Sequence, residues 1–334
     1  MHTELIDPSV IEGAPPRGQP RESIGLAFLG CGAITSTHSR TIQRLDPSIA
    51  RFYASRNPAR AIDFARQFSG RAGYRSYEAA LRSPEVDVVL IATPPSTHLG
   101  LTLAALERGK DVIVEKPAFL TAGDAERVEE LAARTGGRVL VAENYCYKPL
   151  TGFLRRIVES GELGDILFVQ VNATKQQASG GWRTEQSIAG GGALFEGGVH
   201  WIHLMANLGL EVDSVDAIEA GPRRSPERSS LMVFRYRNGA VGTLQHSWET
   251  PSLLRGLRLS KIAGTRGSIT FESNGVAAVV RGRGTRLRFP GLTDIRGYRA
   301  MFADFIQALY HGTPTRMTLA MARSDLALLE AGRR

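Results

Sequence analysis

The sequence contains little cysteine, little lysine and no long apolar run. Its two cysteines, Cys31 and Cys146, lie far apart and match no metal-ligand spacing, so neither a disulfide framework nor a metal site is predicted. No stretch approaches the roughly 20 apolar residues that a membrane span requires. The N-terminal segment carries acidic groups where a secretion signal needs positive charge. We therefore expect a protein of the cytoplasm that contacts no membrane.

The chain is basic, with 41 Lys and Arg residues against 33 Asp and Glu residues, a net charge of +8 and a pI of about 9.8. Only five of the cations are lysines, and the arginines are dispersed apart from a concentration at residues 281–299. A dispersed arginine excess in a chain rich in Ala and Gly is typical of a compositional bias. We therefore expect no nucleic-acid partner, and a nucleic-acid binder stays as the alternative that the charge alone would allow.

The length and the apolar pattern predict two domains after a flexible extension at residues 1–22, which is rich in Pro, Gly and charge. Over residues 23–144, short apolar runs alternate with helical segments. This alternation predicts an α/β domain with a doubly wound parallel sheet, the Rossmann arrangement. The runs lie at 24–29, 49–54, 86–92, 111–114 and 138–142, and the helices at 36–45, 59–68, 98–108 and 122–135.

Residues 145–334 form the second predicted domain, in which strand-like runs follow one another. After a helix at 153–159, the runs lie at 166–174, 230–236, 240–248, 257–263, 268–272 and 276–281. Asn238-Gly239, between two of these runs, is a hairpin signal. The succession predicts an α+β domain built on an antiparallel sheet.

A glycine turn follows the first predicted strand and precedes a helix, as a dinucleotide-binding fingerprint demands. Gly30 permits the tight turn, and Gly32 lets the backbone approach a pyrophosphate. Ala33 and Ile34 begin the helix whose N–H groups would face the anion. Thr35 stands where Gly or Ala is usual, which predicts slightly looser packing of helix on strand.

The second strand is followed by Ser55 and Arg56, where a carboxylate would grip the ribose of NAD. A hydroxyl and a guanidinium bind a 2′-phosphate, whereas a carboxylate repels it. The sequence therefore favours NADP as the cofactor, with NAD as the alternative. A loop position in which Arg56 only stacks on adenine is the competing interpretation of that residue.

Polar groups also follow two later strands, at the edge where open α/β sheets bind ligands. Thr93, Pro94 and His98 follow one strand, and Glu115 and Lys116 end another, before a proline. We expect all five at the cofactor site. A desolvated lysine can donate or accept a proton, so Lys116 is also a candidate catalytic and substrate-binding group, with a surface loop lysine as the alternative.

A second glycine turn, Gly190 to Gly192, leads into a helix that carries Glu196, His200 and His203 at helical spacing. The spacing matches no standard metal site. A carboxylate that orients an imidazole, which then exchanges a proton with a substrate hydroxyl, fits the spacing better. A histidine satisfied within a core helix is the alternative.

Aromatic and basic side chains near these motifs are candidates for binding a sugar ring, since aromatic faces with polar edges suit such substrates. Any one of the aromatic residues is more often part of a core than of a ligand site. The candidates are Tyr145, Tyr147, Trp182, Arg183 and Trp201, which join Lys116, Glu196, His200 and His203 in the predicted substrate site.

The motifs occur in a fixed order: the fingerprint, Thr93-Pro94-Pro95-x-x-His98, Glu115-Lys116-Pro117 and the stretch from Gly190 to His200. This order resembles the Gfo/Idh/MocA family, named after glucose-fructose oxidoreductase and inositol dehydrogenase, over roughly residues 23–330. The resemblance implies a Rossmann domain followed by a domain with an open, mostly antiparallel sheet. That sheet often forms the interface of an oligomer, here a homodimer or homotetramer.

The resemblance also implies hydride exchange between nicotinamide and a sugar, cyclitol or related hydroxy or keto compound. Lys116 takes the family's catalytic lysine position, before a cis bond to Pro117, and His200 takes the catalytic histidine position. Glu196 stands where Asp is usual and would orient His200 or hold a substrate hydroxyl. His203 also replaces a frequent Asp. Both departures predict a substrate other than a simple inositol.

Two alternatives stay open within this resemblance. One is a sugar eliminase or glycosidase that works by transient oxidation and restores its cofactor in each turnover. The other is a non-catalytic sensor of NAD(P) or sugar, against which the presence of Lys116 and His200 speaks.

Overall fold

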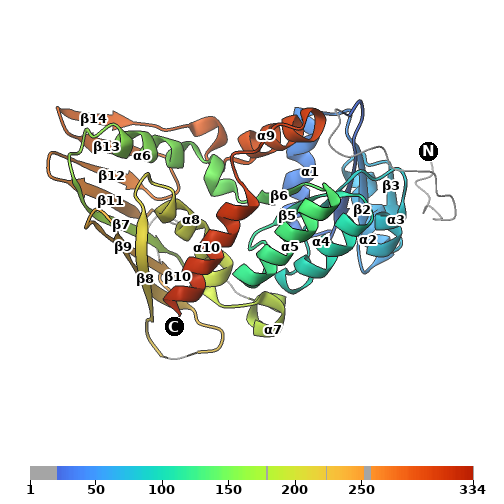
Figure 1. The fold of residues 1–334 in the computed structure, drawn as a ribbon, viewed down its shortest axis with the longest axis horizontal. Coiled ribbons are helices and arrows are strands. Elements are labelled where there is room, and N and C mark those ends of the chain that lie inside the picture. Colours follow the sequence, from blue (N-terminus) through green and yellow to red (C-terminus); the bar gives the residue numbers. More distant parts are fainter. Residues whose placement is uncertain (1–20, 178–179, 223, 252–256, 334) are drawn as a thin grey trace. The chain divides into compact units, whose positions relative to one another are not determined.

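The computed structural model describes residues 21–177, 180–222, 224–251 and 257–333. They form two compact units, the first from residues 21–142 and 298–322 and the second from residues 143–297 and 323–333 (Figure 1). The predicted flexible extension lies outside the described residues except for Arg21 and Glu22. Arg21 forms an ion pair with Asp111 at 2.9 Å.

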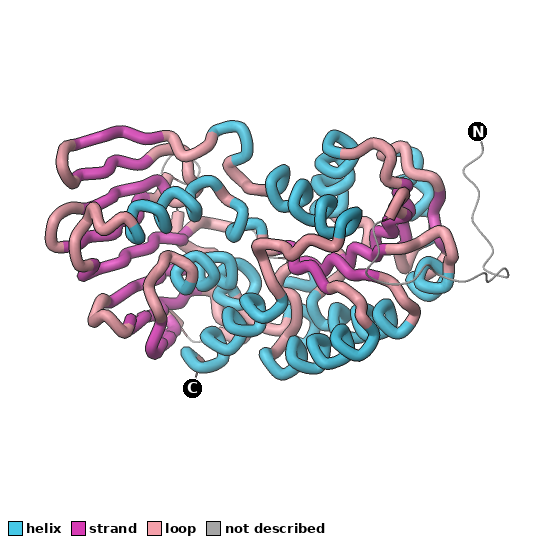
Figure 2. Tube along the Cα trace, turned by 45° about the horizontal axis from the view of Figure 1, so that its top comes forward, coloured by secondary structure: helices cyan, strands magenta, loops and turns pink. Residues whose placement is uncertain are grey.

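Unit 1 contains a six-stranded sheet in the order β3-β2-β1-β4-β5-β6, with every neighbouring pair parallel. This is the doubly wound order of a Rossmann fold, so the prediction is confirmed. Figure 2 shows these strands running between helices. The strands are β1 (Gly25–Leu29), β2 (Ala50–Ala54), β3 (Ala72–Tyr74), β4 (Val88–Ile91), β5 (Asp111–Glu115) and β6 (Val139–Ala142).

Three of the described helices of unit 1 begin at a short polar side chain that caps them. Asn57 caps α2, Ser76 caps α3 and Thr121 caps α5, each by accepting a backbone N–H of the first turn. Strand β3 and helix α3 were not predicted, because three and six residues are too short to show a period. The helices are α1 (Ala33–Leu45), α2 (Pro58–Gln67), α3 (Tyr77–Arg82), α4 (His98–Glu107), α5 (Ala122–Thr135) and α9 (Tyr298–His311), with a 3₁₀ turn η1 (Pro95–Thr97).

Unit 2 contains an eight-stranded sheet in the order β14-β13-β12-β11-β7-β10-β9-β8. Only the β7–β10 pair is parallel among these described strands, so the expected mostly antiparallel sheet is confirmed. The Asn238-Gly239 hairpin joins β9 to β10, with Gly239 at φ +85°. The strands are β7 (Ile166–Thr174), β8 (Val212–Glu219), β9 (Ser229–Tyr236), β10 (Val241–Ser247), β11 (Leu259–Gly264), β12 (Ser268–Glu272), β13 (Ala278–Arg281) and β14 (Thr285–Arg288).

The sheet of unit 2 buries one face and exposes the other. Along β9 and β10, buried residues such as Met232, Phe234 and Leu244 alternate with more exposed ones, as expected for a sheet covered on one side. Helices α6 and α8 lie over the covered face (Figure 1). The remaining elements are η2 (Asn144–Tyr147), α6 (Pro149–Glu159), η3 (Gly181–Thr184), α7 (Gln186–Ala189), η4 (Leu194–Gly198), α8 (Val199–Ala206), η6 (Leu292–Asp294) and α10 (Leu319–Gly332).

The chain returns to unit 1 after the second sheet. Helix α9 packs against α1, where the His38 ring meets the edge of Phe302 at 4.8 Å between centroids. The sequence pattern predicts a second domain over residues 145–334, because the pattern of an amphipathic helix does not indicate which sheet the helix covers. No helix within the described ranges is long and apolar enough to cross a membrane.

Candidate functional site

The glycine turn after β1 fits the pyrophosphate of a dinucleotide. Gly30 has φ +106°, and a Cβ there would lie 2.6 Å from the carbonyl oxygen of Ala92, so only glycine fits. At Gly32, by contrast, a Cβ would meet nothing within 4 Å. Gly32 is the N-cap of α1 and provides no side-chain cap, which leaves the first N–H groups of Ala33 and Ile34 to an anion.

Thr35 ties the same helix to the turn. Its side chain is buried, and its hydroxyl donates to the carbonyl oxygen of Gly30 at 2.7 Å. The hydroxyl therefore has a partner in the position where Gly or Ala was expected, and it fixes the start of α1 against the loop that would hold the cofactor.

Ser55 and Arg56 directly follow β2, where an adenosine ribose lies in Rossmann proteins. Ser55 is buried and its hydroxyl accepts the N–H of Asn57 at 3.2 Å. Arg56 is exposed. The described geometry thus presents a guanidinium and no carboxylate directly after this strand.

His98 connects the two loops that follow β4 and β5. One ring nitrogen, Nε2, lies 2.9 Å from the carbonyl oxygen of Thr93, and Nδ1 lies 3.0 Å from that of Pro117. The ring is buried, and burial lowers the pKa of His98 although these carbonyls oppose the shift. His98 therefore ties the loop at Thr93 to the loop at Pro117.

The Glu115-Lys116-Pro117 loop is anchored by buried contacts. The Glu115 carboxylate contacts Nε2 of the fully buried His38 and also accepts the backbone N–H of Lys116 at 3.1 Å. The Lys116–Pro117 peptide bond is cis, which confirms that prediction. Lys116 itself is half-buried.

In unit 2, the predicted helix with Glu196, His200 and His203 begins with the π-helical turn η4. Regular α-helical spacing starts only at Val199, later than the prediction assumed. Glu196 forms an ion pair with Arg183 at 3.1 Å. His203 is buried, and its Nδ1 lies 2.8 Å from the Asp325 carboxylate of α10. His203 is thus a core histidine with a charged partner, which was the alternative interpretation.

His200 is held by a residue that the sequence analysis missed. Its Nδ1 lies 2.6 Å from the carboxylate of Glu143, whose side chain is 3% exposed, while that of His200 is 16% exposed. The Tyr145 ring stacks on the imidazole at 4.5 Å with an interplanar angle of 14°. The carboxylate at Nδ1 of His200 is therefore that of Glu143, and the ion-pair partner of Glu196 is Arg183.

A buried lysine completes this cluster. Nζ of Lys148 lies 4.2 Å from the centre of the Tyr145 ring, and Trp201 meets the same ring edge-on at 5.0 Å. Burial lowers the pKa of Lys148 to about 8, against the opposing charges of Glu272 and Glu143. A single sequence shows no signal for this group, because Lys148 looks like an ordinary residue before a helix.

The other predicted substrate-site residues differ in their environments. Tyr147 is buried, like Trp201, and belongs to the core of unit 2. The side chain of Trp182 lies outside the described part of the chain. Among the described residues, no group of three or more His, Cys, Asp and Glu is arranged to hold a metal ion.

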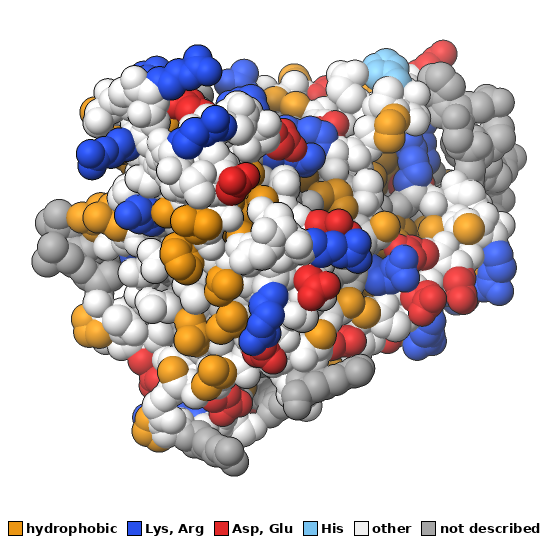
Figure 3. Space-filling view, turned by 60° about the vertical axis from the view of Figure 1, so that its left-hand side comes forward, with side chains coloured by type: hydrophobic (Ala, Val, Ile, Leu, Met, Phe, Trp, Pro, Cys, Tyr) orange, Lys and Arg blue, Asp and Glu red, His pale blue; other side chains and the backbone are white. Residues whose placement is uncertain are grey.

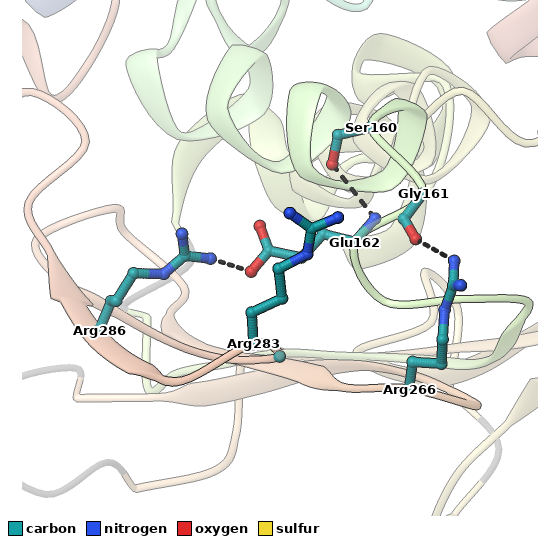
Figure 4. A pocket seen from close by; sticks show the side chains of 7 residues that line it. Ser160, Gly161, Glu162, Arg266, Arg283 and Arg286 are labelled. Atoms are coloured by element: carbon teal, nitrogen blue, oxygen red, sulfur yellow. Dashed lines mark hydrogen bonds and ion pairs between the residues drawn. The ribbon is translucent and has the colours of Figure 1, made fainter.

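A cavity of about 510 Å³ lies beside the β13–β14 hairpin and the turn after α6 (Figure 4). Arg286 pairs with Glu162, and Arg266 donates to the carbonyl oxygen of Gly161 at 2.8 Å, at the end of α6. Part of the arginine concentration at 281–299 therefore has structural roles. None of the predicted site residues lines this cavity, whose lining is Ser160, Gly161, Glu162, Arg266, Gly282, Arg283 and Arg286.

The parallel sheet and its glycine turn define a dinucleotide-binding Rossmann unit, here followed by a unit with a mixed sheet. Two family models match the chain in the same order. The model described as an oxidoreductase family with NAD-binding Rossmann fold matches residues 24–143, and that of the GFO/IDH/MocA C-terminal domain matches residues 153–270. The protein belongs to the Gfo/Idh/MocA oxidoreductase family.

Individual relatives agree with this assignment. The uncharacterized oxidoreductase YfiI of Bacillus subtilis is 29% identical over 239 residues, which are 66% of this chain and 59% of that protein. The chain thus spans about three-fifths of YfiI. Levoglucosan dehydrogenase of Pseudarthrobacter phenanthrenivorans is 26% identical over 289 residues, which are 75% of this chain and 74% of that protein. A solved structure of levoglucosan dehydrogenase in complex with NADH shares the fold, with a TM-score of 0.83 and 23% identity, and the match covers 93% of this chain and 97% of that chain.

Proposed function

We propose that this protein is an NAD(P)-dependent dehydrogenase or reductase that acts on a sugar, cyclitol or related hydroxy or keto compound. The observation that carries the proposal is the turn at Gly30 and Gly32, which leaves the start of α1 open to a pyrophosphate. The name of the relative levoglucosan dehydrogenase supports a sugar-like substrate. Tyr145, which is half-buried and lies against His200, is a candidate wall of the substrate site.

In this proposal, Lys116 and His200 are the catalytic residues that move the hydroxyl proton of the substrate. Nicotinamide, when bound, supplies or accepts the hydride. Glu196, with its partner Arg183, holds a substrate hydroxyl. Tyr145 contributes a wall of the substrate site, and the groups after β1, β2, β4 and β5 bind the cofactor.

The proposal is tested in two stages. Thermal-shift measurements with NADPH and NADH are expected to show stabilisation by at least one of them, because ligands that bind only the folded state raise Tm. A panel of sugars and polyols that includes levoglucosan is then assayed with the better oxidised cofactor. Failure of both cofactors to stabilise the protein would overturn the proposal.

We also propose that the enzyme prefers NADP. Replacing Arg56 with Ala is expected to weaken NADPH binding by roughly 10- to 100-fold, as for the loss of a charge-assisted hydrogen bond, and to change NADH binding little. The measurement is titration of both cofactors by calorimetry. Arg44→Ala, at the opposite end of α1, is the control. Equal losses for NADPH and NADH would contradict a contact of Arg56 with the 2′-phosphate and would fit its stacking on adenine; NADH is bound in the related levoglucosan dehydrogenase structure.

We further propose that the enzyme forms a homo-oligomer through the sheet of unit 2. The sheet exposes large apolar side chains on its uncovered face (Figure 3). Phe168 is 54% exposed and pairs across the strands with Val241, and Val279 pairs with the exposed Leu287. Contiguous exposed apolar surface of this kind marks protein interfaces.

Phe168→Asp is therefore expected to reduce the mass measured by light scattering from a multiple of 36.2 kDa to 36.2 kDa. A charge placed in the centre of an apolar interface is desolvated without a partner, which weakens association. Leu292→Asp, on η6 and also exposed, is the matched control. A wild-type protein that is already monomeric would contradict the proposal.

A further inference from the structure

Glu143 lies at the point where the chain leaves β6 and enters η2. Its side chain is almost fully buried, and its Oε1 receives two contacts. One is the backbone N–H of Tyr145 at 2.9 Å, and the other is Nδ1 of His200 at 2.6 Å. The carboxylate is therefore held by its own turn and directed at the imidazole, which lies 57 residues further along the chain.

The face of the imidazole is fixed as well as its edge. Tyr145, whose N–H holds Glu143, also stacks its ring on His200. The Tyr145 ring is in turn packed against Trp201 and against the ammonium group of Lys148. Four residues thus determine the orientation of one ring. An imidazole that only fills space needs no such fixation, whereas an acid or base must be held in one orientation.

The chemistry of the contact determines the tautomer of His200. An ionised carboxylate can only accept, so Nδ1 carries the proton and Nε2 is the basic nitrogen of the neutral ring. Burial alone would raise the pKa of Glu143, but the charge and hydrogen bond of His200 hold it at about 2, with His203 and the Tyr145 N–H acting in the same sense. The carboxylate is thus ionised throughout the working pH range.

We propose that Glu143 is the positioning residue for His200: it fixes the Nδ1–H tautomer and stabilises the imidazolium that forms when Nε2 accepts the hydroxyl proton of the substrate. This inference rests on the proposed catalytic role of His200. Glu143 stays ionised in the step, because the proton moves from the substrate hydroxyl to Nε2 and not to the carboxylate. Nicotinamide, when bound, would accept the hydride.

Other charged groups act on the same region, and the test has to separate Glu143 from them. Carboxylates and cations come from the neighbouring helices and from the sheet beneath. They are Glu196 with Arg183, His203 with Asp325, His246 of β10, Lys148, Lys175, Arg258, Glu272 and Arg296.

The direct test is NMR of protein labelled with ¹⁵N-histidine, in which His200 is one of seven histidines and is assigned by its loss in His200→Ala. In wild type, Nδ1 is expected to carry the proton of the neutral ring. In Glu143→Gln, the titration midpoint of His200 is expected about 1 to 3 pH units lower, because the charge that stabilises the imidazolium is gone. An unchanged midpoint and tautomer would overturn the inference. This readout needs no substrate.

The kinetic test uses the best substrate of the panel, assayed in the direction of oxidation. Glu143→Gln is expected to lower kcat by about 10²-fold or more with little change in KM, and to move the acidic limb of kcat/KM to lower pH. Glu143→Asp keeps the charge and should restore part of the rate. Glu227→Gln is the matched control, because Glu227 accepts the backbone N–H of Leu194 at the start of η4. It should leave the pH profile unchanged.

The two proposals fail in different ways. If His200→Ala keeps its activity, the proposed catalytic role of His200 is wrong. If His200→Ala is inactive but Glu143→Gln is as active as Glu227→Gln, with the same pH profile, Glu143 has no positioning role and the proposed function stands. In the His200→Ala background, Glu143→Gln should cost nothing further, because residues that act as a unit are not additive.

Discussion

Replacement of Lys116 by methionine is expected to lower kcat by about 10²- to 10⁴-fold, while NADPH and NADH still bind. Methionine keeps the length and the apolar stem of the side chain but has no proton to give or take. The loop that carries Lys116 is held by other groups, namely the contact of Glu115 with His38 and the contact of His98 with Pro117. The loss should therefore fall on the proton transfer and not on the fold.

The measurement compares kcat and KM of Lys116→Met with those of Lys261→Met, an exposed lysine on β11. Cofactor affinity and Tm are measured on the same samples. A loss of kcat and kcat/KM by the same factor indicates an interaction made only in the transition state. Turnover near that of wild type on the true substrate would show that Lys116 does not move the proton.

Much of the local structure of the candidate cofactor site could be predicted, because its signals are local. Gly30 and Gly32 follow a buried strand and precede a helix within a few residues, so their order alone predicts the turn. Ser55, Thr93 and Lys116 also follow strands directly. A parallel sheet brings the carboxyl ends of its strands to one edge, so residues at those positions are neighbours whatever the loops do.

The partners of the two histidines could not be predicted, because they come from distant segments. Glu143 is 57 residues from His200, and Asp325 is 122 residues from His203. Each carboxylate lies beside its histidine only because of how a particular turn or helix packs within unit 2. From the sequence, the nearest carboxylate at helical spacing from His200 is Glu196, at i−4. The π-helical turn η4 interrupts the regular α-helical spacing on which that pairing depends.

The largest effect of a substitution on stability is expected at the His203–Asp325 pair. Side chains of both residues are almost fully buried, 1% and 4% exposed, and the contact joins α8 to α10 within unit 2. Asp325→Asn is expected to lower the free energy of unfolding of unit 2 by about 3–5 kcal/mol. Without the carboxylate, the buried His203 has no opposite charge beside it. All three tryptophans, at positions 182, 201 and 248, lie in unit 2, so urea unfolding followed by tryptophan fluorescence reports on this unit.

The effect should depend on pH in a defined direction. Burial alone would lower the pKa of His203, but the charge and hydrogen bond of Asp325 hold it well above 6.5. In wild type, the folded state therefore binds more protons than the unfolded state above about pH 6.5, and stability falls as pH rises toward the raised pKa. In Asp325→Asn, the buried imidazole loses this support and is neutral, so the variant loses stability as pH falls below about 6.5.

The difference in free energy of unfolding between wild type and Asp325→Asn is accordingly expected to be larger at pH 6 than at pH 9. Glu211→Gln provides the contrast, because Glu211 pairs with Arg237 where both side chains are 65% exposed. Exposed pairs of this kind contribute less than about 1 kcal/mol, so its effect should be small at both pH values. If the two variants are equally stable at pH 6, the buried pair does not stabilise unit 2, and His203 keeps its place through packing alone.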